Sequence, residues 1–171
     1  MEASRVERRH GYVDVSKLSP GEALGMLSGL VLLGSLWLPW FSTSASNPNS
    51  HLHGASHGAS VSAWDTFPIL RWLLLAACVA PFILSWIIAR GHKLTWRPGE
   101  VTMVVGITAF ILIISNGIVL GKPHDSGDTT AIGISLDYGY LIALIASFGM
   151  AVAGYLRQAY YSEGRRPPGT F

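Results

Sequence analysis

Four long apolar stretches constrain the fold of this chain more than any other feature. Each is close to the roughly 20 residues that a helix needs to cross a hydrocarbon core of about 30 Å. Apart from Arg71, near the start of the second stretch, they contain no Asp, Glu, Lys or Arg. The stretches are 23–41, 69–89, 101–120 and 138–156. They predict an all-α fold, a four-helix transmembrane bundle, because a soluble chain of this size could not bury four such faces.

The composition agrees with a membrane protein. Charged residues make up 13% of the 171 residues, and hydrophobic residues make up 50%. Soluble domains usually carry about 25% charge, so this chain has about half the charge that a water-facing surface needs. That balance excludes a disordered chain and a nucleic-acid-binding arm, and we expect no nucleic-acid partner. With a single cysteine, Cys78, an internal disulfide is impossible.

Lysine and arginine are distributed unevenly between the segments that flank the four stretches. Cytoplasmic segments of membrane proteins carry an excess of both residues. The richer side holds Arg5, Arg8, Arg9, Lys17, Arg90, Lys93, Arg97, Arg157, Arg165 and Arg166, whereas the loops of the other side hold Lys122. We therefore expect both termini in the cytoplasm and a multi-pass protein of the plasma membrane. The expected parts are a cytoplasmic segment 1–19, a transmembrane domain 20–158 with an outer loop 42–68, and a cytoplasmic tail 159–171.

A short sequence repeat precedes the first and third stretches. Segment 17–22 reads Lys-Leu-Ser-Pro-Gly-Glu, and segment 93–100 reads Lys-Leu-Thr-Trp-Arg-Pro-Gly-Glu. Both segments lie on the side that we expect to be cytoplasmic. The repeat predicts two tandem helical hairpins, related by an axis along the membrane normal.

The repeat places Glu22 and Glu100 at equivalent helix starts. A carboxylate pair at the mouth of a pore could attract cations, and acids near the membrane often mark ion paths. Asn116 on the third stretch could extend such a path. The alternative is helix capping, because Ser19, Pro20 and Glu22 fit a capping box with Pro at the first helical position.

Three further charges form a possible cluster on the outer side. Arg71 could pair with Asp65 or Asp137, which would tie the two hairpins together, or extend along the helix to the outer surface. An Arg at this depth could also bind an anionic substrate.

The outer loop contains three histidines, His51, His53 and His57. Imidazole suits Zn, Cu and Ni, so these residues form a candidate metal site. Their surroundings are rich in Ser, Ala, Gly and Asn, which is more typical of a flexible low-complexity loop. We expect no cofactor.

The first two stretches carry a resemblance to known proteins. Segment 37–41 reads Trp-Leu-Pro-Trp-Phe, and segment 62–67 reads Ser-Ala-Trp-Asp-Thr-Phe. This pair resembles a pattern in four-span integral membrane proteins of actinobacteria, which implies a bacterial plasma membrane and no particular activity. Claudins share the topology, but their first outer loop needs a Cys pair that 42–68 lacks.

Small residues provide close-packing faces on two stretches. They are Gly25 and Gly29 on the first, and Ala143, Ser147 and Ala151 on the fourth. Such faces allow helix backbones to approach closely, either within the chain or in a dimer.

The sequence favours a non-enzymatic membrane protein, an accessory or assembly subunit that docks on another membrane complex or on itself. Its expected partners are the lipid bilayer and another membrane protein or a second copy. One alternative is a small channel or transporter with Glu22 and Glu100 as inner gate charges. A second alternative is a metal sensor that uses the three histidines of the outer loop.

Overall fold

The structure, a computed structural model, describes residues 18–43, 60–90, 99–119 and 134–163. The described chain is mostly helical, with one small sheet. The helices are α1 (Pro20–Ser35), α2 (Ala63–Thr66), α3 (Leu70–Ala89), α4 (Glu100–Ile114), the π-helix η2 (Ser115–Val119) and α5 (Tyr138–Glu163). The strands are β1 (Pro39–Ser42), β2 (Ser60–Ser62) and β3 (Ser135–Leu136).

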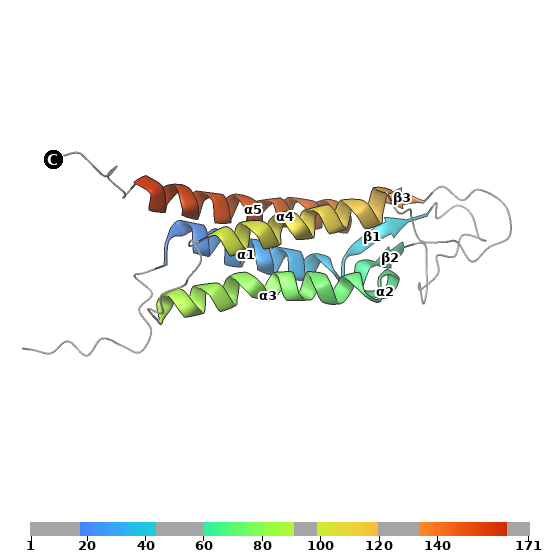
Figure 1. Ribbon diagram of the computed structural model, residues 1–171. Helices are drawn as coiled ribbons and strands as arrows, with labels where there is room; N and C mark the ends of the chain where they lie inside the picture. Colours follow the sequence, from blue (N-terminus) through green and yellow to red (C-terminus); the bar gives the residue numbers. More distant parts are fainter. Residues whose placement is uncertain (1–17, 44–59, 91–98, 120–133, 164–171) are drawn as a thin grey trace, which may run out of the picture.

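The four long helices lie side by side along one axis (Figure 1). Helix α1 packs against α3 and α5, and α4 packs against α5 and, less extensively, against α3. The sheet lies at one end, which we call the sheet end. Helices α1 and α4 begin at the opposite end, where α3 and α5 finish (Figure 1), and we call this the basal end.

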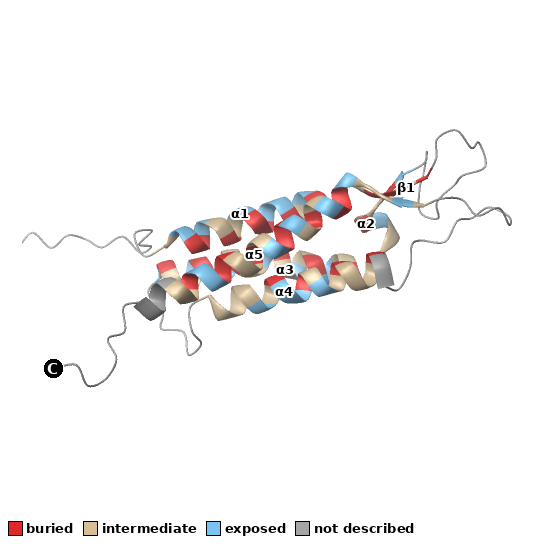
Figure 2. Cartoon of the chain, turned by 90° about the horizontal axis from the view of Figure 1, so that it is seen from above, coloured by how far each residue is buried: buried red, intermediate tan, exposed pale blue. Residues whose placement is uncertain are grey.

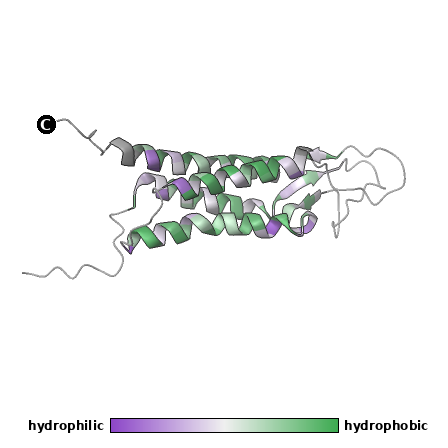
Figure 3. Ribbon diagram, viewed as in Figure 1, coloured by the Kyte–Doolittle hydropathy of each residue, from purple (hydrophilic) through white to green (hydrophobic). Residues whose placement is uncertain are grey.

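Three of these helices are long and apolar enough to cross a membrane. They are Leu70–Ala89, Glu100–Gly117 and Tyr138–Ala159. Hydrophobic residues cover the middle of the long helices, and the most hydrophilic residues lie near their ends (Figure 3). The second predicted stretch, 69–89, agrees with α3 to within one residue, and α5 begins at the predicted residue, Tyr138.

Helix α1 is shorter than the sequence suggested, and the expected continuous helix over 23–41 is wrong. Its 16 residues extend about 24 Å at 1.5 Å per residue. The chain leaves the helix before Pro39, whose ring disfavours a helical conformation in the preceding residue. The indole N–H of Trp40 then donates to the Ser35 carbonyl at 2.8 Å, which satisfies one of the free carbonyls at the helix end.

The sheet corrects the expectation of an all-α fold. Its strand order is β2-β1-β3, and both pairings are antiparallel. Phe41 on β1 lies opposite Val61 on one side and Leu136 on the other. The sheet therefore joins segments from the two predicted outer loops to the residues that follow α1.

Two other boundaries differ from the expected ones. The third stretch is α-helical only to Ile114 and continues as the π-helix η2. The fourth continues beyond residue 156 to Glu163, so α5 enters the segment that we expected to be a tail.

The interior is filled by large side chains from all four long helices. Leu32, Leu74, Ile113 and Met150, one from each long helix, are fully buried, and buried positions recur along each helix (Figure 2). At the sheet end the largest fully buried side chains are aromatic, namely Trp40, Phe41 and Tyr140. The Trp40 and Tyr140 rings meet edge to face, with 5.5 Å between their centroids.

The small-residue faces are used inside the chain. A Cβ on Gly29 would lie 2.8 Å from the carbonyl oxygen of Cys78 on α3. A Cβ on Gly106 of α4 would lie 2.4 Å from the backbone nitrogen of Ala151. Both distances are too short for real side chains, so these faces permit the close packing of α1 on α3 and of α4 on α5.

Candidate functional site

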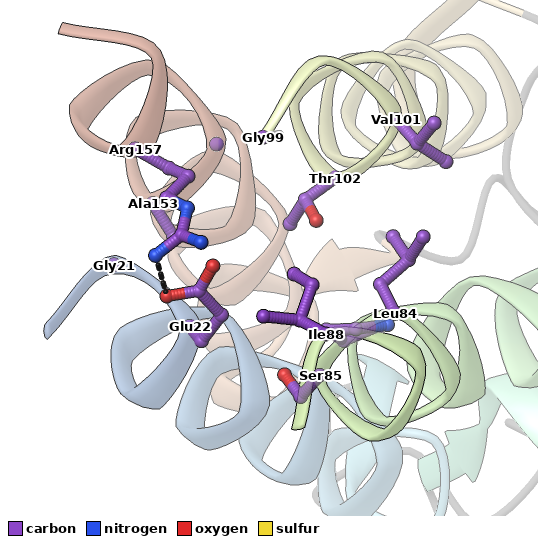
Figure 4. A pocket seen from close by; sticks show the side chains of 13 residues that line it. Gly21, Glu22, Leu84, Ser85, Ile88, Gly99, Val101, Thr102, Ala153 and Arg157 are labelled. Atoms are coloured by element: carbon purple, nitrogen blue, oxygen red, sulfur yellow. Dashed lines mark hydrogen bonds and ion pairs between the residues drawn. The ribbon is translucent and has the colours of Figure 1, made fainter. Parts of the chain in front are cut away.

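A buried ion pair joins α1 to α5 at the basal end. Arg157 Nη1 lies 2.6 Å from Glu22 Oε2, and the two side chains are only 8% and 7% exposed. Figure 4 shows the two side chains meeting between the helices. Charge-assisted hydrogen bonds of this length are among the stronger polar contacts in proteins.

The same carboxylate caps α1. Glu22 Oε2 accepts a hydrogen bond from the Ser19 N–H at 2.7 Å and a second from the Ser19 hydroxyl. The capping interpretation of Glu22 is therefore confirmed. A carboxylate near a helix N-terminus also opposes the positive end of the helix dipole. Oε2 thus has three donors around it, two from Ser19 and one from Arg157.

Both repeated Gly-Glu sequences lie against the same part of α5. A Cβ on Gly21 would lie 3.3 Å from the Arg157 Cβ, and one on Gly99 would lie 2.8 Å from it. Gly99 also has φ 91°, a left-handed conformation that strains other residues. The repeat thus provides two glycines that allow α1 and α4 to approach α5 around Arg157.

The two repeated glutamates have different surroundings. Glu22 forms an ion pair with Arg157 and hydrogen bonds with Ser19. Glu100 is partly buried and forms no ion pair within the described residues. The two carboxylates therefore do not have equivalent surroundings.

A small pocket lies beside the ion pair. Its lining includes Glu22, Arg157, Ser85 and Thr102 (Figure 4). The cavity volume is about 20 Å³, which is about the space of one ordered water. The buried Ser85 Oγ has no hydrogen-bond partner within the described chain. The pocket suits a water molecule on Ser85 and is too small for an organic substrate.

Sequence reasoning missed the role of Arg157. In the sequence, Arg157 is distinguished only as one of the cations expected on the cytoplasmic side. The buried face of α5 includes Tyr140, Ala143, Ser147, Met150 and Ala153. Arg157 follows Ala153 by four residues and so continues this face, which is the signal that could have identified it.

At the sheet end, the two predicted acids hold helix starts: Asp65 bonds Ser62, the residue that caps α2, and Asp137 caps α5. Asp65 Oδ2 accepts from the Ser62 hydroxyl at 2.7 Å at the start of α2. Asp137 Oδ1 accepts from the Tyr138 N–H at 2.7 Å at the start of α5. The Asp137 N–H donates to the Trp40 carbonyl at 2.8 Å, which connects α5 to β1.

Arg71 contacts tryptophans within the described chain. Its Nη1 donates to the Trp64 carbonyl at 3.0 Å. The guanidinium carbon lies 5.3 Å from the Trp64 ring centroid and 5.7 Å from that of Trp72. Both distances are within cation–π range. The described chain gives Arg71 no ion pair with Asp65 or Asp137.

Asn116 hydrogen-bonds its own helix. Its Nδ2 donates to the Leu112 carbonyl at 2.8 Å, within the segment where α4 becomes η2. The amide therefore satisfies a backbone carbonyl at this transition.

The candidate metal ligands His51, His53 and His57 lie outside the described residues. Within 18–43, 60–90, 99–119 and 134–163, there is no group of three or more His, Cys, Asp or Glu side chains that could hold a metal ion.

Comparison with known proteins gives no further guidance, because no family model, curated protein or solved structure matches this chain.

Proposed function

We propose that this chain is a non-enzymatic integral membrane protein, an accessory or assembly subunit that docks on another membrane protein or on a second copy of itself. The proposal includes four membrane-inserted helices, with both termini in the cytoplasm of a bacterial cell. The three membrane-length helices and the excess of Lys and Arg on one side support insertion and this orientation.

The observation that carries the proposal is that the candidate polar groups serve structural contacts. Glu22 caps α1 and pairs with Arg157. Asp65 accepts from the hydroxyl of Ser62, the residue that caps α2, and Asp137 caps α5. Asn116 bonds its own helix. Groups held in this way stabilise a fixed architecture, and that suits a protein whose role is to hold others in place.

The packed interior favours a scaffold over a channel. Leu32, Leu74, Ile113 and Met150 are fully buried between the polar pocket at the basal end and the sheet at the other. An ion in transit would need polar groups or water along this section. A single copy would therefore conduct only after large rearrangement. Unchanged flux in proteoliposomes after Glu22→Gln plus Glu100→Gln would count against the channel alternative.

The outer faces of α3 and α4 form the surface available for docking. Only 28% of the membrane-length window of α3 and 22% of that of α4 are buried, compared with 50% for α5. Exposed large side chains on α3 include Leu73, Val79 and Ile83. In a bilayer this surface would contact lipid or a partner helix.

Site-specific photo-cross-linking in native membranes tests the proposal. A photoreactive amino acid at Ile83, which is 54% exposed, should give a discrete cross-linked product larger than the monomer. The same residue at Leu74, which is 0% exposed, should not. If probes at Ile83, Ile107 and Ile145 all give only monomer, the docking role is incorrect.

A further inference from the structure

An arginine and three tryptophans gather at the sheet end, and we call Arg71, Trp37, Trp64 and Trp72 the Arg71 cluster. Trp37 stacks on Trp64, with 5.1 Å between ring centroids and 21° between the planes. Trp72 meets Trp64 edge to face at 5.5 Å. The guanidinium lies over both Trp64 and Trp72. The four residues come from three places in the sequence, so the cluster depends on the tertiary fold.

The charge of Arg71 is not neutralised by the described part of the chain. The only hydrogen bond that its guanidinium makes there is from Nη1 to the Trp64 carbonyl, a neutral acceptor. Its Nε is buried and has no hydrogen-bond partner among the described residues. A guanidinium has five N–H donors, and leaving a buried donor unpaired costs free energy. Because Nε is covered by its neighbours and Nη1 already donates once to Trp64, the donors that remain for a ligand are those of the two terminal nitrogens, together with the full positive charge.

The two ring contacts fix the direction of the guanidinium. An arginine side chain loses considerable rotamer entropy when it is immobilised. Here the cation–π contacts and the Nη1 bond restrict the side chain before any ligand arrives. Arginine also presents its donors as a planar fork that matches the oxygens of phosphate. A ligand with a phosphate group is thus the chemical class that best suits this cluster.

The neighbouring side chains indicate the depth of the cluster in a membrane. Trp37 is 54% exposed, Trp72 is 55% exposed, and Ile69 is 75% exposed. Tryptophan prefers the boundary between the hydrocarbon and the headgroups, where lipid phosphates also lie. Exposed tryptophans beside an unneutralised Arg therefore provide both an apolar and an ionic contact for one lipid.

We propose that the Arg71 cluster binds the phosphate of an anionic phospholipid headgroup at the outer surface of the membrane. This site rests on the membrane insertion in the proposed function and is independent of docking on a partner. In the cluster, the phosphate oxygens accept hydrogen bonds from the guanidinium of Arg71, while Trp72 contacts the adjoining part of the lipid.

Native mass spectrometry of the full chain, extracted in mild detergent, tests the site. Titration with phosphatidylglycerol or phosphatidylcholine should show one retained phosphatidylglycerol with an affinity about tenfold above that for phosphatidylcholine. Both lipids have a phosphate, but the choline cation of phosphatidylcholine offsets its charge and is repelled by Arg71. Arg71→Gln should abolish this preference, and Arg71→Lys should weaken it. Millimolar inorganic phosphate should not displace the lipid.

Arg90 provides a matched control at the other end of α3. Its guanidinium carbon lies 4.7 Å from the Trp86 ring centroid, so it is also an arginine beside a tryptophan. Arg90→Gln should leave the preference for phosphatidylglycerol unchanged.

Four results would overturn the lipid site. They are an unchanged preference in Arg71→Gln, an equal loss in Arg90→Gln, no preference in the wild-type chain, or displacement of the lipid by inorganic phosphate. If Arg71→Gln fails to fold, the site is tested by two other measurements. They are the headgroup preference of the wild-type chain and its weakening in Arg71→Lys. Insertion into vesicles is measured separately. If the wild-type chain inserts but shows no headgroup preference, the lipid site is wrong and membrane insertion still holds.

Discussion

Neutralising Glu22 should strongly destabilise the protein, because it breaks the buried ion pair with Arg157. Glu22→Gln retains the size of the side chain but leaves the cation of Arg157 buried without its carboxylate. Both side chains are less than a tenth exposed. Breaking a buried ion pair by removing one partner costs about 3–5 kcal/mol, and we expect about 3 kcal/mol here because the amide can still accept from Ser19.

The assay is reversible unfolding of the detergent-solubilised chain in a titration with sodium dodecyl sulfate, followed by tryptophan fluorescence. A double-mutant cycle uses Glu22→Gln, Arg157→Gln and the combined variant. The stability losses of the two single variants should not sum to the loss of the combined variant. The coupling free energy between the two side chains should be about 1–3 kcal/mol. The repeat offers a matched control, Glu100→Gln, which should change stability by less than about 0.5 kcal/mol.

The reasoning is refuted if Glu22→Gln costs no more than Glu100→Gln. It is also refuted if the losses in the double-mutant cycle add, because the ion pair would then contribute no coupling. A cost in Glu22→Gln that persists in the Arg157→Gln background would assign the effect to the helix cap alone.

Two further predictions concern backbone approach and the end of α1. Gly99→Ala should lower the free energy of unfolding by at least about 2 kcal/mol, because its Cβ would lie 2.4 Å from the Gly154 carbonyl oxygen. Gly34→Ala, where nothing lies within 4 Å, should be neutral or slightly stabilising in the same unfolding assay. Equal costs for the two variants would contradict this packing. Trp40→Phe should cost about 1–3 kcal/mol through loss of the bond to Ser35, and a thermal unfolding midpoint equal to wild type would argue against that bond.

The helices with strong local signals could be predicted from the sequence. The hydrophobic stretches gave α3 to within one residue and the start of α5, because length and hydropathy act within a single segment. The Ser19–Glu22 cap was also predictable, since its partners are three residues apart. The strand β1 was not predictable, because Pro39–Ser42 continues an apolar stretch and its pairing partners are distant in sequence.

The contacts that define the candidate sites depend on tertiary structure. Glu22 and Arg157 are 135 residues apart, and no local pattern links them. The sequence indicates that Arg71 is unusual for its depth, but its contacts with Trp64 and Trp72 depend on the turn around α2. In that turn the Asp65 carboxylate already accepts from Ser62.

The most direct test of the docking role is affinity purification of the tagged chain from native membranes in a mild detergent, with the particle mass measured and its components identified by mass spectrometry. We predict a stoichiometric complex that contains another membrane protein or a second copy of this chain. A lone monomer, with no cross-linked partner trapped before extraction, would contradict the proposed function.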